Sequence, residues 1–119
     1  MFDHIGLKVT NLDKSVRFYS SALGALGHVL GSHDETYAGI GPKEAPGLWL
    51  YAHKGTGGPG THIAFSAKDR AGVDRFHAEG MKAGGRDNGK PGLRADYSPT
   101  YYAAFLIDPD GNNVEAVCS

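Results

Sequence analysis

His4-Ile5-Gly6-Leu7, at the start of the chain, and His62-Ile63-Ala64-Phe65, in its second half, are two copies of one short pattern. The same offset of 58 residues relates three further pairs: Arg17 and Arg75, Phe18 and Phe76, and Gly27 and Gly85. Self-similarity at a fixed offset indicates a repeated structural unit. We therefore predict two equivalent modules, each opening with a histidine that an internal two-fold can bring close to the other.

The same order of elements is predicted in both halves of the chain. Alternation of Ile5, Leu7 and Val9 with less apolar neighbours predicts a strand over 2–9. Asn11 or Asp13 can cap a helix that runs to about Gly24, and short strands follow near 28–32, 36–40 and 47–53. In the second half we expect a strand over 62–67, a helix over about 69–83, strands near 85–88, 100–107 and 112–117, and a long loop over 89–99. The predicted fold class is α+β, with two βαβββ modules.

Residues 54–61, Lys-Gly-Thr-Gly-Gly-Pro-Gly-Thr, have the composition of a linker. We expect one domain over 1–119, with module one at 1–53 and module two at 62–119, because this length buries a single core. Asp108-Pro109-Asp110-Gly111 is interpreted as a tight turn between the last two strands, since the glycine of a calcium-binding loop is replaced by Asn113.

Composition excludes several kinds of partner. Twelve basic and 13 acidic side chains give a net charge of −1, and no basic run is present, so we expect no binding to nucleic acid or to a membrane surface. There is no apolar run near the ~20 residues of a membrane span. One cysteine, Cys118, forms no internal disulfide, which favours the reducing cytoplasm.

Strand alternation gathers polar side chains on one face of each predicted sheet. His4 and Lys8 share a face of the first strand, His62 and Ser66 a face of the strand that opens module two, and Glu115 belongs to a third such face. Their neighbours are apolar and suited to packing beneath helices. Trp49, Tyr51 and His53 also share a face, which predicts an aromatic wall beside a cavity with a group able to transfer protons.

The paired histidines, the repeated βαβββ order and the closing Asp-Pro-Asp-Gly-x-x-x-Glu resemble the vicinal oxygen chelate superfamily. That group includes glyoxalase I, bleomycin-resistance proteins, fosfomycin-modifying enzymes and extradiol dioxygenases. The resemblance covers Asp3 to Val117 and implies a curved mixed sheet around a cavity. It implies the metal ligands His4, His62 and Glu115, with Glu115 as a candidate base. Lys8, Trp49, Tyr51, His53 and Ser66 are then candidate substrate-binding residues.

One position departs from the glyoxalase I pattern. Aligning Leu48-Trp49-Leu50-Tyr51 with Val114-Glu115-Ala116-Val117 places Trp49 where a fourth ligand would stand, and an indole cannot coordinate a metal. Two imidazoles and a carboxylate still suit Fe, Mn, Ni, Co or Zn and leave positions for two adjacent substrate oxygens. The resemblance thus implies one divalent ion per site, acting as a Lewis acid in lyase, isomerase or dioxygenase chemistry.

Several functions remain open. The first is a metal-dependent enzyme acting on a small oxygenated substrate. The second is a non-catalytic module of the bleomycin-resistance type that binds or sequesters small molecules. A fosfomycin-modifying type is a minority alternative, since Gly6 replaces a threonine of those enzymes and their basic C-terminal segment is missing, and a metal-dependent sensor is a further one. By analogy we expect a homodimer in which His4 of one subunit meets His62 and Glu115 of the other.

Overall fold

The computed structural model describes residues 1–53 and 61–119, so the predicted linker, apart from Thr61, lies outside the described residues. The elements follow the predicted order within each half. They are β1 (Ile5–Val9), α1 (Leu12–Gly24), β2 (Val29–His33), β3 (Tyr37–Gly41) and β4 (Leu48–Ala52), then β5 (His62–Ser66), α2 (Arg70–Lys82), β6 (Arg86–Leu93), β7 (Tyr102–Ile107) and β8 (Asn113–Cys118). The predicted α+β fold of two βαβββ modules is confirmed.

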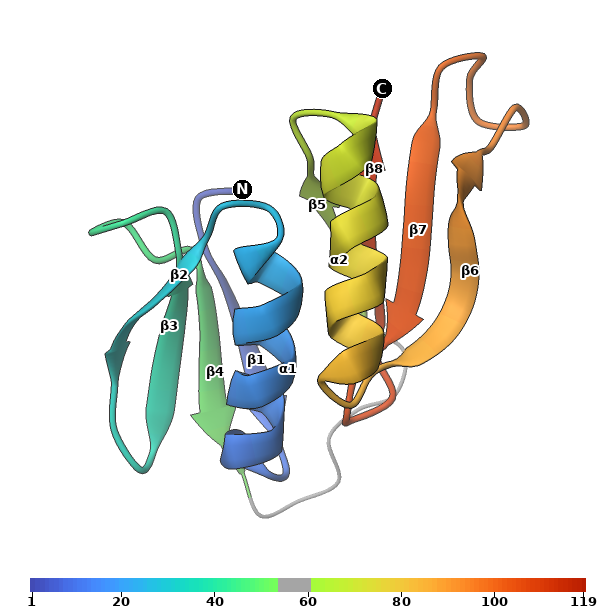
Figure 1. Ribbon diagram of the computed structural model, residues 1–119. Coiled ribbons are helices and arrows are strands. Elements are labelled where there is room, and N and C mark those ends of the chain that lie inside the picture. The colour runs from blue at the N-terminus through green and yellow to red at the C-terminus, as the bar shows by residue number, and fades with distance from the viewer. Residues whose placement is uncertain (54–60) are drawn as a thin grey trace.

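Each module forms one four-stranded mixed sheet of the same topology. The strand orders are β1-β4-β3-β2 and β5-β8-β7-β6. In both sheets the first strand pairs in parallel with the last, and the remaining pairs are antiparallel. The first strand of each module therefore lies at a sheet edge, and Figure 1 shows these edges, β1 and β5, in the middle of the molecule.

The helices start at side chains that accept backbone hydrogen bonds. Asn11 caps α1 by accepting from the Lys14 N–H, and Asp69 caps α2 by accepting from the Gly72 N–H. A cap of this kind satisfies an N–H that has no partner within the helix. Of the two predicted caps of the first helix, Asn11 is the one used. No helix among the described residues is long and apolar enough to cross a membrane.

Strand β6 is longer than predicted, because it extends through the first half of the expected loop 89–99. Its Asn88-Gly89-Lys90-Pro91-Gly92 segment has turn-like composition, but it lies at the edge of the second sheet. The register with β7 shifts between Asp87 and Gly89 and again between Gly89 and Gly92. Edge position and bulges tolerate proline and glycine, so the strand continues to Leu93 and the loop covers 94–101.

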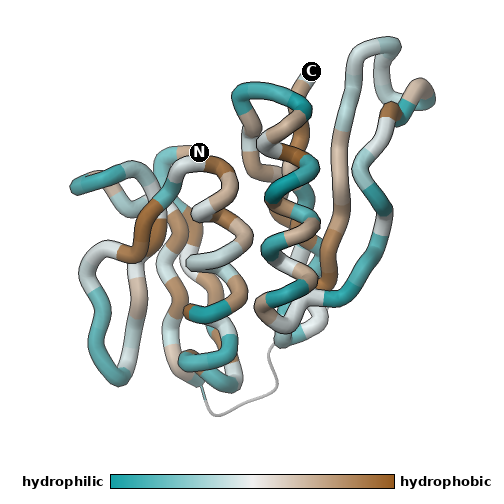
Figure 2. Tube along the Cα trace, viewed as in Figure 1, coloured by the Kyte–Doolittle hydropathy of each residue, from teal (hydrophilic) through white to brown (hydrophobic). Residues whose placement is uncertain are grey.

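One hydrophobic core joins the two modules. The helices α1 and α2 lie side by side, with a sheet extending from each (Figure 1), and hydrophobic segments follow the inner strands while hydrophilic ones gather in the outer loops (Figure 2). Gly85 of module two lies so close to Phe18 of module one that a Cβ on Gly85 would be 2.3 Å from the Phe18 ring. The close approach requires glycine at this contact.

The turn between β7 and β8 also ties the modules together. It is the predicted tight turn, with the Gly111 N–H donating to the Asp108 carbonyl. Asp110 accepts hydrogen bonds from the backbone and hydroxyl of Thr10, and Asp108 accepts one from the Tyr19 hydroxyl. Burial and the neighbouring Asp108 carboxylate raise the pKa of Tyr19 well above its usual value, so this hydroxyl stays protonated. The turn thus anchors module two on module one.

Candidate functional site

His62 and Glu115 form the chemical centre of the second sheet. The imidazole Nε2 of His62, on β5, lies 3.0 Å from Oε1 of Glu115, on β8. Glu115 is only 3% exposed, whereas about half of the His62 side chain is exposed. Parallel pairing places Ala64 opposite Glu115, so alternation along β5 puts His62 on the same face. The structure therefore brings together two of the three predicted metal ligands.

The orientation of His62 is determined by its other ring nitrogen. Nδ1 lies 3.2 Å from the backbone carbonyl oxygen of Asn113, which can only accept a hydrogen bond. This contact leaves Nε2 as the ring nitrogen nearer to the Glu115 carboxylate. An imidazole nitrogen that carries no proton is the form that binds a metal ion.

Tyr101 adds a member to this centre that the sequence did not reveal. Its hydroxyl donates to Oε2 of Glu115 at 2.6 Å. This hydrogen bond, with smaller contributions from burial and from the Glu115 charge, raises the pKa of Tyr101 to about 12. The phenol is therefore a stable donor at neutral pH. Tyr101 lies in the loop before β7, and only its even spacing from Phe105 hinted that it shares this face.

Phe105 and Arg94 extend the same face across the sheet. Phe105 is the antiparallel partner of Glu115, and its ring is stacked near His62 with centroids 6.4 Å apart and an interplanar angle of 21°. The guanidinium carbon of Arg94 lies 5.4 Å from the centre of the Phe105 ring. The open face of module two, meaning the side of its sheet away from α2, thus carries His62, Glu115, Tyr101, Phe105 and Arg94.

The open face of module one is aromatic instead. Glycine makes room for rings that lie flat on this sheet: a Cβ on Gly39 would be 2.6 Å from the Trp49 ring, and one on Gly6 would be 3.1 Å from the Tyr51 ring. Tyr37 completes the group, with its ring centroid 6.2 Å from that of Trp49. Flat, partly exposed rings of this kind offer a stacking surface to a ligand.

The strand registers place Trp49 and Glu115 at equivalent points of the two sheets. Trp49 is opposite Gly6 in the first sheet, and Glu115 is opposite Ala64 in the second. Gly6 and Ala64 are themselves equivalent in the repeat. The alignment made from sequence is therefore confirmed, and within one chain only module two carries a carboxylate at this position.

The remaining predicted site residues are not brought to His62 and Glu115 by a single chain. The side chain of His4 is 72% exposed and its Nδ1 lies 2.6 Å from a carboxylate oxygen of Asp3. Lys8 and Ser66 are exposed near the ends of β1 and β5, and His53 is exposed just after β4. Across residues 1–53 and 61–119, no three His, Cys, Asp or Glu side chains lie close enough to hold a metal ion.

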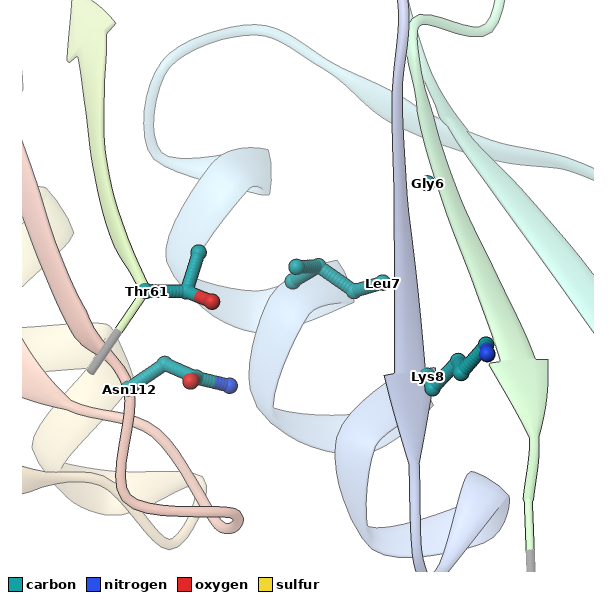
Figure 3. A pocket seen from close by; sticks show the side chains of 5 residues that line it. All are labelled: Gly6, Leu7, Lys8, Thr61 and Asn112. Atoms are coloured by element: carbon teal, nitrogen blue, oxygen red, sulfur yellow. The ribbon is translucent and has the colours of Figure 1, made fainter. Parts of the chain in front are cut away.

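A cavity of about 260 Å³ lies where the two modules meet. Its lining is formed by Gly6, Leu7, Lys8, Thr61 and Asn112. In Figure 3 Leu7 extends toward Thr61 and Asn112 of the second module, whereas Lys8 extends to the opposite side of β1. The open face of module one, which includes Lys8, is thus turned away from module two, and neither His62 nor Glu115 lines this cavity.

Comparison with solved structures identifies several proteins of the same architecture. A glyoxalase/bleomycin resistance protein from Albidiferax ferrireducens T118 is 29% identical, with a TM-score of 0.81 over 98% of this chain and 97% of that one. A glyoxylase/bleomycin resistance protein/dioxygenase domain from Frankia sp. EAN1pec is 23% identical, with a TM-score of 0.72 over 100% and 97%. A bleomycin-binding protein complexed with bleomycin is 18% identical, with a TM-score of 0.65 over 100% and 98%. The last two likenesses show the fold alone.

Family comparison covers almost the whole chain. A search of curated proteins finds no match. The family model described as Glyoxalase/Bleomycin resistance protein/Dioxygenase superfamily matches residues 1–116. This range includes His4, His62 and Glu115. With the repeat, the paired sheets and this match together, the chain belongs to the glyoxalase/bleomycin resistance protein/dioxygenase superfamily.

Proposed function

We propose that this protein is a divalent-metal-dependent enzyme whose substrate is a small oxygenated molecule held through two adjacent oxygens. The observation that carries the proposal is the facing pair of His62 Nε2 and Glu115 Oε1, 3.0 Å apart, with His62 Nδ1 committed to a backbone carbonyl. A second hydrogen bond that orients a ligating histidine is characteristic of metal sites. These donors fit Fe, Mn, Ni, Co or Zn.

The proposed roles of the residues follow from their contacts. His62 and Glu115 would hold the ion, which when bound supplies a Lewis acid that stabilises an enolate or alkoxide. Glu115 is assigned the role of proton acceptor because its carboxylate is buried and faces the reacting centre. Tyr101 positions that carboxylate through its hydrogen bond to Oε2. Trp49 and Tyr51 are assigned to the wall that packs against the substrate.

A second copy of the chain would complete the site. His4 is exposed just before β1, and among the described residues of its own chain it belongs to no group of three side chains that could hold a metal ion. The open face of module one is turned away from the open face of module two, so each needs a facing surface. We propose a homodimer in which His4, Trp49 and Tyr51 of one copy face His62 and Glu115 of the other. Each of the two sites then contains one aromatic face and one polar face.

The second candidate function is non-catalytic binding of a small molecule. The flat aromatic surface formed by Trp49 over Gly39 and Tyr51 over Gly6 favours it, because such a surface binds ligands without any metal. A solved relative of this fold is a bleomycin-binding protein. Metal stoichiometry separates the two functions, since only the enzyme requires an ion at His62 and Glu115.

The decisive experiment is a metal titration of the apo protein with Fe(II), Mn(II), Ni(II) and Zn(II), followed by calorimetry. We expect about one ion per chain. His62→Ala and Glu115→Gln should each weaken binding by more than the roughly 10- to 100-fold typical of outer-shell changes. His33→Ala, an exposed histidine on β2, is the matched control and should bind like the wild type. Equal affinities in all four proteins would contradict the metal site.

Mixing variants tests whether the site is shared. His4→Ala and Glu115→Gln chains should each bind metal weakly alone. In a mixed dimer with shared sites, one site receives both substitutions and the other receives neither, so a wild-type affinity should reappear after the two proteins are unfolded and refolded together. If each site belonged to one chain, every site would still carry one substitution and no tight binding would return. The recovered affinity therefore decides between the two arrangements.

A further inference from the structure

Arg94 is held in a fixed position at the end of β6. Its Nη1 donates to the Gly92 carbonyl and its Nη2 to the Lys90 carbonyl, both at 2.8 Å. The guanidinium lies over the Phe105 ring, with its carbon 5.4 Å from the ring centre. A guanidinium has five N–H donors, so several remain after these two hydrogen bonds. The side chain is half-buried and its charged end is already oriented.

No carboxylate neutralises this guanidinium. Among the described residues, no Asp, Glu or chain terminus forms an ion pair with Arg94, and residues 54–60 contain no acidic side chain. Arg70 provides the contrast on the helix side of the same sheet. It lies over the Tyr102 ring at 5.0 Å, and that tyrosine donates its hydroxyl to Asp74, which supplies a negative charge locally. Arg94 has an aromatic partner and no such anion.

Arg94 lies on the same face as His62 and Glu115. Across the second sheet the order is β5, β8, β7, β6. His62 is therefore on one edge strand, Glu115 is on the strand beside it, and Arg94 follows the strand at the opposite edge. Phe105 on β7 connects them, because its ring is near both the His62 ring and the Arg94 guanidinium. At Gly89 a Cβ would lie 3.0 Å from the Phe105 ring and 3.1 Å from Arg94 Nη2. Glycine there makes room for the stacked pair.

This face therefore presents three kinds of chemistry in sequence. A metal-binding and proton-accepting end is formed by His62, Glu115 and Tyr101, a flat apolar middle by Phe105, and a cationic end by Arg94. A planar guanidinium with free donors matches a carboxylate or phosphate through two parallel hydrogen bonds. A molecule that used the whole face would need an oxygenated head, a flat middle and an anionic tail.

We infer that Arg94 binds the anionic group of the substrate, so that the substrate class is a small organic anion with an oxygenated head and a flat unsaturated or aromatic middle. The assignment of the oxygenated head of the substrate rests on the proposed function. The assignment of its anionic tail rests on Arg94 alone. Carboxylate and phosphate share the required chemistry. Arg94 is a specificity-determining residue under this assignment, distant from the atoms that react.

The test compares ligands that differ only in the tail. The probes are 3-(3,4-dihydroxyphenyl)propanoate, its neutral amide, and the corresponding 3-(3,4-dihydroxyphenyl)propyl phosphate. Calorimetric titrations use the purified full chain, with and without Zn(II), as wild type, Arg94→Met, Arg94→Lys and Arg70→Met. Arg70→Met is the matched control, because it removes an arginine stacked on a tyrosine from the other side of the sheet. Thermal melting of each variant checks that it is folded.

We expect the wild type to bind at least one of the two anions about 10- to 100-fold more tightly than the amide, as expected for a charged hydrogen bond. Arg94→Met should abolish that preference and leave amide affinity within about twofold, while Arg94→Lys should retain part of it. Arg70→Met should behave like the wild type. Comparing the carboxylate with the phosphate then shows which anion the site prefers.

Three results would overturn the assignment. They are equal wild-type affinity for anion and amide, equal weakening of both by Arg94→Met, and no binding of any probe at millimolar concentration. Failure of the proposed function would give a different result. The protein would bind no metal ion but would still bind the anionic probes more tightly than the amide. A protein that binds metal and shows no tail preference would retain the proposed function and lose only the role of Arg94.

Discussion

The open faces of the two modules are built on the same backbone and carry opposite chemistry. In module one, glycines at positions 6 and 39 let Tyr51 and Trp49 lie flat on the sheet. In module two, His62, Tyr101 and the buried Glu115 form a connected polar group. Strand order and parallel pairing are the same in both sheets. A repeated fold therefore determines where side chains point, while the residue at each point determines the chemistry.

Trp49 and Glu115 show this division most clearly. They occupy equivalent register positions, opposite Gly6 and Ala64 respectively, yet one is an aromatic surface and the other a buried acid. A chain with both faces alike would form either two polar sites or two aromatic surfaces. Because the two modules differ in sequence, each chain carries one polar face and one aromatic face. This is the pair of faces that the proposed dimer site requires.

The largest expected effect tests whether the two modules form one cooperative unit. Phe18 of α1 is fully buried and contacts Gly80 and Gly85 of module two. Phe18→Ala should lower the free energy of unfolding by about 3–5 kcal/mol, and both modules should still unfold in a single transition. Chemical denaturation followed by circular dichroism and by fluorescence of Trp49, which lies in module one, measures this.

The matched control for Phe18→Ala is Val29→Ala, since Val29 is 46% exposed on β2. Its effect should be about 0.5 kcal/mol or less. Two separate transitions in the Phe18 variant, one seen by fluorescence and a later one seen by circular dichroism, would show that each module is stable alone. The two modules would then be independent domains and would not form one cooperative unit.

A smaller effect is expected at the turn that joins the modules. Tyr19→Phe removes the hydrogen bond from module one to the buried carboxylate of Asp108. Hydrogen bonds to charged groups contribute about 1.5–3 kcal/mol, so the free energy of unfolding should fall by about that amount. Tyr102→Phe removes the same atom from an exposed contact with Asp74 and should cost about 0.5 kcal/mol or less. Equal losses in both variants would show that the turn does not anchor the modules.

The smallest expected change in stability concerns the polar face of module two. Tyr101→Phe removes one hydrogen bond to Glu115 and should cost about 1 kcal/mol at neutral pH. The pKa of Tyr101 is about 12 in the folded protein against an ordinary value of 10.0. This contribution is therefore complete below pH 10 and is lost as the pH rises through about 12.

Ultraviolet absorbance of tyrosinate follows that titration directly. The wild type should show a step near pH 12 that is missing in Tyr101→Phe. If the absorbance lost in the variant were instead a step near the ordinary value of pH 10.0, the Tyr101 hydroxyl would not be bound to Glu115 in solution. The polar group on the open face of module two would then consist of His62 and Glu115 alone. That face would differ less from the aromatic open face of module one.

Local sequence predicted those helices and turns whose geometry depends on a single local interaction. Asn11 and Asp69 cap their helices because an extended residue with a side-chain acceptor satisfies a free N–H. Asp108 to Gly111 forms the expected turn. Strand β6 was predicted too short, because Gly89 and Pro91 have the composition of a turn, and only the edge position and the bulges show why a strand tolerates them.

The candidate site was only partly predictable for a related reason. Alternation along β5 and β8 indicated that His62 and Glu115 face the same way, and they are in contact. Tyr101 was not predicted as a site residue, because it lies in a loop, where its even spacing from Phe105 is only a weak signal. Arg94 follows the end of β6, and the two carbonyls and the Phe105 ring that hold it are brought to it by the tertiary structure.

The sequence by itself determined the repeat, the family and the residues that share each strand face, because periodicity and capping depend on neighbours along the chain. Only the tertiary structure decided which faces meet. Packing of α1 against α2 turns the open face of module one away from module two, so His4 lies apart from His62 and Glu115. Distances between modules depend on how two surfaces fit in space, and no local pattern in the chain encodes that fit.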